Sequence, residues 1–528
     1  MNENIRELNP YSSDRKVPSF RILDSKTLIR EKTISSGAYG VIYIAKLKEN
    51  NNLYAVKQNN VDKTGDFHIS IREMDIHLRL NGHPFINPLK GVSFGNPFEN
   101  GINSKIDSSC KKDILYFLYD PAAYDGYDLI YTLESNFKKM KVAMIQFLLG
   151  LEYMHSKNII HRDLKPSNIL WFRGKENNRF FKLCDFGLSK PLCSMGSETP
   201  RVVTISYRSP EIAFGFEKYD TKSDVWSAGC IFYEMITKSL LINLKDDSNS
   251  KLLIKIFSII PRNIEEQRLK EMDSVGTIYK NIKNIDKTWE ECLSLSKEKI
   301  KDFNDSSGSY EDFLDLLSHI VEIDPKKRFT ATEALNHKFF ENNKNYIESM
   351  RIKFPPVSDD LPLISINSCK EREWIKELVM IYFSENNKKW YKDRILFMGI
   401  DIFDRYLNYI YCDENKIFDS DISKRDKINI EFKFEMCMYL AYKYFNIMVH
   451  FISFRDFSKK RYVEKYHVKF EMFLIWRVLD LKIYRPTLYD IAENLEKDDV
   501  EKLLVFLCKL KTENLYINEL YSNFKNLK

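Results

Sequence analysis

Four short motifs follow one another along the first part of the chain, and each suits a phosphate group or a metal ion. A glycine-containing turn, ISSGAYGVI at 34–42, lies between two runs of alternating apolar residues, and YAVK at 54–57 ends the next run. HRDLKPSNIL follows at 161–170, and DFG at 185–187 comes directly after the apolar FFKLC. Glycines in a hairpin let backbone N–H groups approach phosphates without a Cβ clash. Each motif alone is weak support for a function, but all four in this order restrict the chain to very few folds.

The residue types in these motifs suit the transfer of a phosphoryl group. Asp163 is placed to accept a proton from a hydroxyl, and Lys165 can neutralise charge on the transferred group. Asn168 and Asp185 can hold Mg²⁺, because amide and carboxylate oxygens are its usual ligands. Lys57 ends an apolar run, so we expect its side chain to face a cleft. A plain hairpin or a solvated lysine explains one motif, but it does not explain the ordered set.

The ordered motifs are the protein-kinase signature, and the chain resembles a eukaryotic-type protein kinase over 28–340. The resemblance implies an α+β fold of two lobes, a small β-rich N-lobe and a helical C-lobe, which uses ATP and Mg²⁺ and acts on a protein substrate. It implies that Asp163 is the catalytic base, assisted by Lys165, and that Lys57 pairs with Glu73 of the helix expected in HISIREMDIHLRL. Asn168 and Asp185 are the implied metal ligands. The implied ATP-binding residues are Ile34, Ser35, Gly37, Gly40, Ile42, Ala55, Lys57, Asp120 and Ala122.

The resemblance also assigns structural roles and shows one departure. Glu211 is expected to pair with Arg328, and Asp224 is expected to brace the backbone of the catalytic loop. Tyr119 stands at the gatekeeper position beside the adenine. Ser35 replaces the first glycine of the family's phosphate loop, which puts the grip on the nucleotide in doubt. The alternative is therefore a pseudokinase, a scaffold whose helical domain recruits a partner protein.

Within the family, the chain resembles the cyclin-dependent kinase group. VVTISYRSPE at 202–211 matches the group's VVT.WYRAPE, except that Ser206 replaces the tryptophan, and FHISIRE at 67–73 lies where the group has its PSTAIRE helix. Lys165 in the form HRDLKPSN favours serine or threonine over tyrosine as the acceptor. The resemblance implies a preference for a proline after the acceptor, weakened by Ser206.

Regulatory positions follow from the same resemblance. Thr199 lies where the group carries its activating phosphothreonine, and Arg72 and Arg162 are the cations available to bind that phosphate, with Lys190 where a third arginine is expected. Tyr39 matches the inhibitory tyrosine of the glycine loop. The alternative is that Thr199 is an ordinary loop residue.

The rest of the chain divides into an arm, a linker and a helical region. Residues 1–27 are polar and are expected to form a loose N-terminal arm, and 341–364 contain three prolines typical of a linker. Residues 365–528 show helical periodicity almost throughout, which predicts an all-α domain. FDRYL, LAYKYFN and VLDLKIYRP within it resemble the helices of a cyclin box, with Asp404 and Lys443 at the box positions.

A cyclin-like domain in the same chain implies an activator for the kinase. It is expected to dock on the FHISIRE helix, either within one chain or between two chains of a homodimer, and the sequence leaves both open. The alternative for 365–528 is a generic helical bundle that only packs.

Composition excludes several other classes of protein. The 528 residues include 81 Lys and Arg and 75 Asp and Glu, and a net charge of +6 does not suggest nucleic-acid binding. We expect no membrane-spanning helix and no secretory signal, because no stretch approaches 18 uninterrupted apolar residues and the N-terminus is polar. The nine cysteines are scattered without a CxxC pair, which favours reduced thiols in the cytoplasm or nucleus.

Overall fold

The computed structural model describes two groups of residues that belong to different compact units. One unit comprises Met1–Asn60 and Leu80–Pro356, and the other comprises Val61–Arg79 and Val357–Lys528. The structure describes residues 21–24, 27–37, 40–59, 68–95, 114–132, 137–173, 179–192, 204–216, 220–244, 246–261, 264–272, 310–355, 398–403, 434, 436–438 and 441. No helix in these described ranges is long and apolar enough to cross a membrane.

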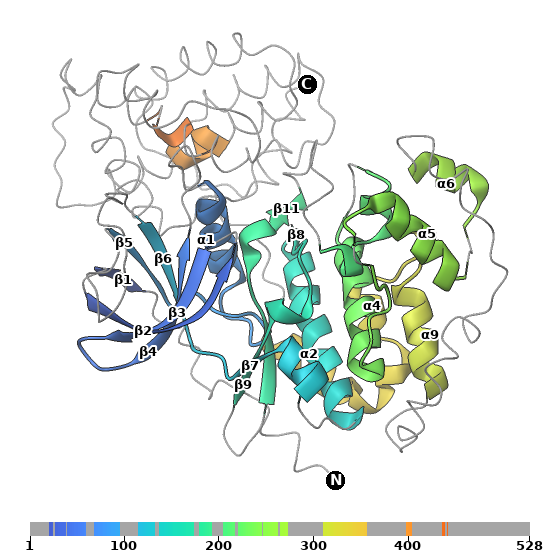
Figure 1. Cartoon of the computed structure of the whole chain (residues 1–528), viewed down its shortest axis with the longest axis horizontal. Helices are drawn as coiled ribbons and strands as arrows, with labels where there is room; N and C mark the ends of the chain where they lie inside the picture. Colours follow the sequence, from blue (N-terminus) through green and yellow to red (C-terminus); the bar gives the residue numbers. More distant parts are fainter. Residues whose placement is uncertain are drawn as a thin grey trace, which may run out of the picture. The chain divides into compact units, whose positions relative to one another are not determined.

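The first compact unit, Met1–Asn60 with Leu80–Pro356, is called the kinase unit below, and it begins with a six-stranded sheet (Figure 1). Its strands lie in the order β1-β5-β6-β4-β3-β2, and all neighbours are antiparallel except β1 and β5, which are parallel. The strands are β1 (Arg21–Asp24), β2 (Leu28–Gly37), β3 (Gly40–Leu47), β4 (Leu53–Asn59), β5 (Gly91–Gly95) and β6 (Ile114–Tyr119). The predicted meander of β2, β3 and β4 is present, with one face packed around Tyr43, Val56 and Tyr116.

Strand β1 corrects the expected boundary of the N-terminal arm. The arm was expected to be loose over 1–27, but 21–24 pair in register with 91–94 of β5. This parallel pairing joins segments about seventy positions apart, so no local pattern in the sequence predicts it.

The turn between β2 and β3 depends on a glycine. Gly37 and Gly40 face each other in the register, and Gly40 has φ +147°, a conformation that side chains rarely adopt. A Cβ on Gly40 would lie 2.1 Å from Gln58 O of the neighbouring strand β4. Only glycine lets the backbone of the hairpin approach β4 this closely.

Helices make up the second part of the same unit (Figure 1). The long helix α2 (Phe137–Ser156) packs against α4 (Lys222–Thr237) and α10 (Ala331–Leu335). Gly150 of α2 and Gly229 of α4 permit close packing, because a Cβ would lie 3.1 Å from Phe85 O and 2.5 Å from Val321 Cγ1, respectively. Further helices among the described residues are α3 (Pro210–Ala213), α5 (Asn249–Ile259), α6 (Glu266–Met272), α9 (Tyr310–Ile320) and α11 (Lys344–Lys353), with 3-10 helix η11 (Lys338–Asn343) and the π-helical turn η2 (Asp128–Thr132).

Helix α11 corrects the predicted start of the linker. The linker was expected from 341, but η11 and α11 continue the fold to Lys353. Tyr346, Ile347 and Met350 form a buried face on α11, and this short apolar repeat was obscured by the polar residues around it.

Two small sheets connect the six-stranded sheet to the helices. One has the order β10-β9-β7 and the other pairs β11 with β8. Their strands are β7 (Tyr124–Asp125), β8 (Ile159–Ile160), β9 (Ile169–Arg173), β10 (Arg179–Leu183) and β11 (Lys190–Pro191).

The second compact unit contains most of helix α1 (His68–Leu80), which forms where the sequence predicted it. Its other described residues, 398–403, 434, 436–438 and 441, are all helical. Phe403 packs edge-on against Phe434 with ring centroids 5.2 Å apart, and Gly399 packs on Met438. The all-α domain predicted for 365–528 stays a prediction, because most of it, including the predicted box residues Asp404 and Lys443, lies outside the described residues.

Candidate active site

The loop after strand β8 brings together three of the residues predicted to act in phosphoryl transfer. Lys165 Nζ lies 2.7 Å from Asp163 Oδ2. Asn168 Nδ2 donates to Asp163 O at 2.7 Å and to Asp163 Oδ2 at 3.0 Å. Asp163 and Asn168 are buried and Lys165 is partly exposed, so the carboxylate is held by a cation and an amide at the edge of the protein interior.

Asp224, in the first turn of α4, holds the backbone of this loop as predicted. Its carboxylate accepts hydrogen bonds from His161 N at 2.8 Å and Arg162 N at 3.0 Å, and His155 Nε2 lies 3.0 Å away. Burial by itself would raise the pKa of Asp224, but the hydrogen bonds and the charges of the two histidines hold it below its ordinary value. Arg162 has φ +69°, a strained conformation for a side-chain residue, which these bonds help to maintain.

The DFG segment follows β10 and lies beside the same loop. Cys184 N donates to Asn168 O at 3.0 Å, and His161 Nε2 lies 3.0 Å from Cys184 O. These contacts place Asp185 next to Asn168. Because Asn168 Nδ2 is directed at Asp163, the amide oxygen is the atom available for a metal, and with the Asp185 carboxylate it makes a donor set that fits Mg²⁺.

Lys57 connects the six-stranded sheet with this segment. It lies on β4 opposite Ile42 of β3 and Phe117 of β6, and its Nζ is 2.8 Å from Asp185 Oδ1. Burial would raise the pKa of Asp185, but the charge and hydrogen bond of Lys57 lower it below its ordinary value. The cleft-facing lysine predicted from YAVK therefore contacts the DFG aspartate.

The residues predicted to bind ATP lie on neighbouring strands and on the segment that follows them. Ser35 of β2 faces Ile42 of β3, and Ala55 of β4 faces Tyr119 of β6. Ile34 and Ser35 are exposed, and Gly37 and Gly40 form the hairpin end. Asp120 and Ala122 lie between β6 and β7, and Ala123 N donates to Trp171 O at 2.8 Å, which anchors this connection to β9.

The end of the activation segment reaches the catalytic loop through Thr204. Its hydroxyl donates to Asp163 Oδ1 at 3.2 Å, and Lys165 Nζ donates to the Thr204 hydroxyl oxygen at 3.5 Å. The 3-10 helix η7 (Ile205–Tyr207) follows at once. The bond between Thr204 and Asp163 spans 41 positions, and the VVT motif that contains Thr204 does not predict it.

Buried polar groups fix the segment that follows Thr204. Tyr207 OH donates to Glu234 Oε2 at 2.8 Å, and Ser227 Oγ donates to Tyr207 O at 2.7 Å. Arg328 makes two hydrogen bonds to Glu211, at 2.7 and 2.9 Å, with both side chains almost fully buried. The pairing of Glu211 with Arg328 was predicted; Glu234 was missed, because a lone glutamate in an apolar helix carries no motif.

The structure does not place several of the predicted residues in this site. Glu73 and Arg72 are buried in α1, which belongs mainly to the other compact unit, so the Lys57–Glu73 pair remains a prediction. Tyr39 and Thr199 lie outside the described residues. Arg162 is buried in the catalytic loop.

Among the described residues, the cluster of Asp315, His319 and His337 also has the geometry of potential metal ligands. However, His319 Nδ1 lies 2.7 Å from the backbone O of Asp315, and His337 Nδ1 accepts from Phe339 N at 3.2 Å. His337 Nε2 therefore carries the proton that faces Asp315 Oδ2 at 3.2 Å. These bonds assign the cluster to the packing of α9 against η11.

Comparison with known proteins agrees with the geometry. Residues 28–340 match the protein kinase domain family. The chain is 33% identical over 352 residues to probable cyclin-dependent kinase 10 of Dictyostelium discoideum, an alignment that covers 65% of this chain and 85% of that protein. It is 34% identical over 328 residues to probable cyclin-dependent kinase 8 of the same organism, covering 58% of this chain and 79% of that protein. It is 31% identical over 345 residues to serine/threonine-protein kinase ppk23 of Schizosaccharomyces pombe, covering 64% and 77%. The chain therefore belongs to the protein kinase family, as a serine/threonine kinase related to the cyclin-dependent kinases.

Proposed function

We propose that this kinase transfers the γ-phosphoryl group of ATP to a serine or threonine followed by proline, and that its C-terminal domain activates it by engaging helix α1. The observation that carries the catalytic part is the convergence of Lys165, Asn168 and Thr204 on Asp163, beside the Lys57–Asp185 pair.

In this proposal each group has a role that its surroundings support. Asp163 accepts the proton of the substrate hydroxyl, and Thr204 and Lys165 hold its carboxylate in position. Lys57 neutralises the nucleotide phosphates, and Lys165 neutralises the group in transfer. Asn168 and Asp185 would hold Mg²⁺, which would supply charge neutralisation for the phosphates.

The preference for proline rests on the segment between Thr204 and Arg208. Tyr207 and Arg208 are buried, while Ser206 is only partly buried. Arg208 Nη2 lies 3.0 Å from Asp247 Oδ1, and Arg208 Nη1 donates to Asn249 Oδ1 at 2.6 Å. These bonds fix the backbone that would receive the residue after the acceptor, and the small Ser206 in place of tryptophan predicts a modest selectivity.

The division of the chain into two compact units supports activation by the C-terminal domain. Val61–Arg79, which contains most of α1, belongs to the same compact unit as Val357–Lys528. A domain that holds this helix would control the position of Glu73 and hence its pairing with Lys57. This grouping favours a regulatory role over a helical bundle that only packs.

The test is phosphate transfer by the full chain to a matched pair of peptides, one with Ser-Pro and one with Ser-Ala. We expect transfer to both, with a higher kcat/KM for Ser-Pro, and loss of transfer in Asp163→Asn. Lys443→Glu tests the regulatory part against the matched control Lys433→Glu, and we expect only the former to lower kcat. Equal rates for both peptides would exclude proline direction, and no transfer at all would favour the scaffold alternative.

A further inference from the structure

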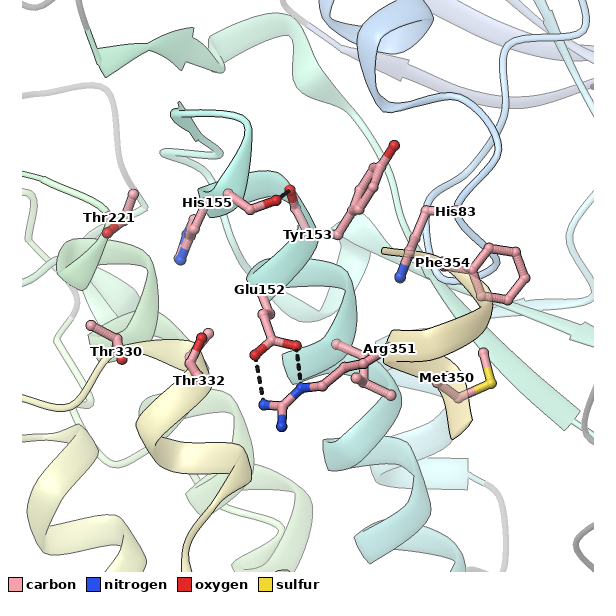
Figure 2. Close-up of a pocket in the computed structure, with 13 residues that line it drawn as sticks. His83, Glu152, Tyr153, His155, Thr221, Thr330, Thr332, Met350, Arg351 and Phe354 are labelled. Atoms are coloured by element: carbon pink, nitrogen blue, oxygen red, sulfur yellow. Dashed lines mark hydrogen bonds and ion pairs between the residues drawn. The ribbon is translucent and has the colours of Figure 1, made fainter. Parts of the chain in front are cut away.

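The last helix of the kinase unit, α11, is held by different contacts along its length. Its middle is packed through the buried side chains of Tyr346, Ile347 and Met350. Its C-terminal end carries Arg351 and continues into Phe354. Figure 2 shows Arg351 beside Glu152 of α2 and Phe354 beside His83, among the residues that line one pocket.

Arg351 joins the end of α11 to the end of α2. Its Nε lies 2.9 Å from Glu152 Oε2 and its Nη2 lies 2.6 Å from Glu152 Oε1, and a third nitrogen donates to Asn336 Oδ1 at 3.1 Å. A two-bond contact between guanidinium and carboxylate is directional as well as strong. The side chains are 28% and 18% exposed, so water screens this pair less than a surface pair.

Phe354 joins the end of the unit to the loop that follows α1. Its ring lies edge-on to His83, with centroids 5.7 Å apart, and His83 stacks on Tyr153 of α2 at 4.5 Å (Figure 2). His83 is buried, and burial together with the charge of Lys182 lowers its pKa to about 3. The imidazole is therefore neutral at physiological pH and behaves as an aromatic packing group.

The loop that contains His83 links α1 to the active site. His83 is three positions after Leu80, the last residue of α1. Leu183 N donates to Phe85 O, and Asn87 N donates to Leu183 O, both at 2.9 Å. Leu183 ends β10, two positions before Asp185. Phe354 thus contacts a loop that is continuous with α1 and bonded to the strand that leads into DFG.

A pocket at the C-terminal end of α11 limits the side-chain contacts that hold this end of the helix. It has a volume of about 440 Å³ and separates this end of α11 from α2 and α10. Its lining includes Leu149, Thr221 and Thr332, so part of the surface beneath α11 is not filled by side chains of the helix. The end of the helix is held by the Arg351 bonds to Glu152 and Asn336 and by the contact of Phe354 with His83.

We propose that Arg351 and Phe354 are positioning residues that fix the exit of the chain beside the loop following α1, so that the C-terminal domain acts on α1 of its own chain. This inference rests on the proposed activation by that domain. A fixed exit next to the base of α1 raises the local concentration of the tethered domain there, which favours docking within one chain over docking between two chains.

The experiment measures specific activity of the full chain against its concentration, from nanomolar to micromolar. For the wild type we expect a constant specific activity, as docking within one chain requires. For Arg351→Glu combined with Phe354→Ala, we expect a specific activity lower by about two- to threefold and still independent of concentration, because the intact tether keeps the domain at a higher effective concentration than second chains supply.

Three controls keep the result interpretable. Ile352→Ala alters an exposed residue of the same turn and should behave as the wild type. Arg351→Lys retains the charge without the two-bond geometry. Its specific activity should lie between those of the wild type and of the Arg351→Glu, Phe354→Ala variant. Arg351→Glu alone should lower the specific activity, and adding Glu152→Arg to it should restore the wild-type value, which separates the role of the contact from a folding defect.

The possible outcomes separate this inference from the proposal on which it rests. If Lys443→Glu lowers activity but the Arg351 and Phe354 variant keeps a constant, full specific activity, the inference is overturned and activation by the C-terminal domain stands. A wild-type specific activity that rises with concentration would also overturn it, because docking would then occur between chains. If Lys443→Glu has no effect at any concentration, both proposals fail.

Discussion

Thr204 donates a hydrogen bond to Asp163 across 3.2 Å and so joins the end of the activation segment to the catalytic loop. The same threonine oxygen lies 3.5 Å from Lys165 Nζ, which in turn contacts Asp163. Thr204, Lys165 and Asp163 thus contact one another pairwise, and the first two hold the Asp163 carboxylate that we propose as the base. The orientation of this carboxylate therefore depends on the activation segment being in place.

Replacing Thr204 with valine keeps the shape of the side chain but removes the hydroxyl. We expect kcat to fall about ten- to a hundredfold, because a hydrogen bond to a charged group contributes about 1.5–3 kcal/mol. The KM for ATP should change little, and Thr204→Ser should keep most of the activity. Steady-state kinetics on the three proteins measures this, and a valine variant with full kcat would contradict the assigned role.

The buried pair of Glu211 and Arg328 predicts a large loss of stability when one partner is removed. Glu211→Gln leaves the Arg328 charge in an interior site, and breaking such a pair costs about 3–5 kcal/mol of unfolding free energy. Denaturant unfolding measures the effect. Lys344→Ala, which removes the exposed contact with Glu341, is the control and should change stability by less than about 1 kcal/mol.

His83 predicts a pH dependence of stability. Its pKa is near 3 in the folded protein against an ordinary value of 6.5, so below pH 6.5 the unfolded chain binds a proton that the folded chain does not. The unfolding free energy should therefore fall as the pH is lowered from 6.5, by on the order of 2 kcal/mol at pH 5 from this residue alone. His83→Gln should have a shallower slope over this range. Identical slopes for the two proteins would show that His83 titrates normally in the fold.

Gly126 predicts a specific intolerance to a side chain. A Cβ at this position would lie 2.5 Å from the backbone O of Pro166, which follows Lys165 in the catalytic loop. Gly126→Ala should displace that loop and lower both stability and kcat, whereas Gly82→Ala, where no atom lies within 4 Å of the added carbon, is the matched comparison. Because Gly82 has φ +98°, its variant should lose stability through backbone strain but keep kcat. Equal kcat values for the two variants would contradict the contact.

Much of the site was predictable because its motifs are local. The hairpin, Lys57, the catalytic loop and DFG each lie within a few consecutive residues whose pattern indicates a strand, a turn or a loop. The Glu211–Arg328 pair and the support from Asp224 were also predicted, through the resemblance to protein kinases. In each of these cases the chemistry is visible in one short segment or one familiar motif.

The features that escaped prediction depend on distant contacts. Strand β1 pairs with β5, and Thr204 reaches Asp163 across 41 positions. The buried face of α11 is only Tyr346, Ile347 and Met350 within a polar stretch, so the sequence pattern predicts a linker there instead of a helix. No short stretch of the sequence predicts that Phe354 contacts His83, because that contact forms only once α2 and α11 are packed together.

The central claim is that this serine/threonine kinase catalyses transfer and depends on its C-terminal domain for full activity. The most direct measurement is the rate of phosphate transfer from ATP to a Ser-Pro peptide by four full-length proteins: the wild type, Lys443→Glu, Lys433→Glu and Asp163→Asn. We predict full activity in the wild type and Lys433→Glu, strongly reduced activity in Lys443→Glu, and none in Asp163→Asn. Equal rates in the wild type and Lys443→Glu would contradict the claim of activation, and equal rates in the wild type and Asp163→Asn would contradict the catalytic mechanism.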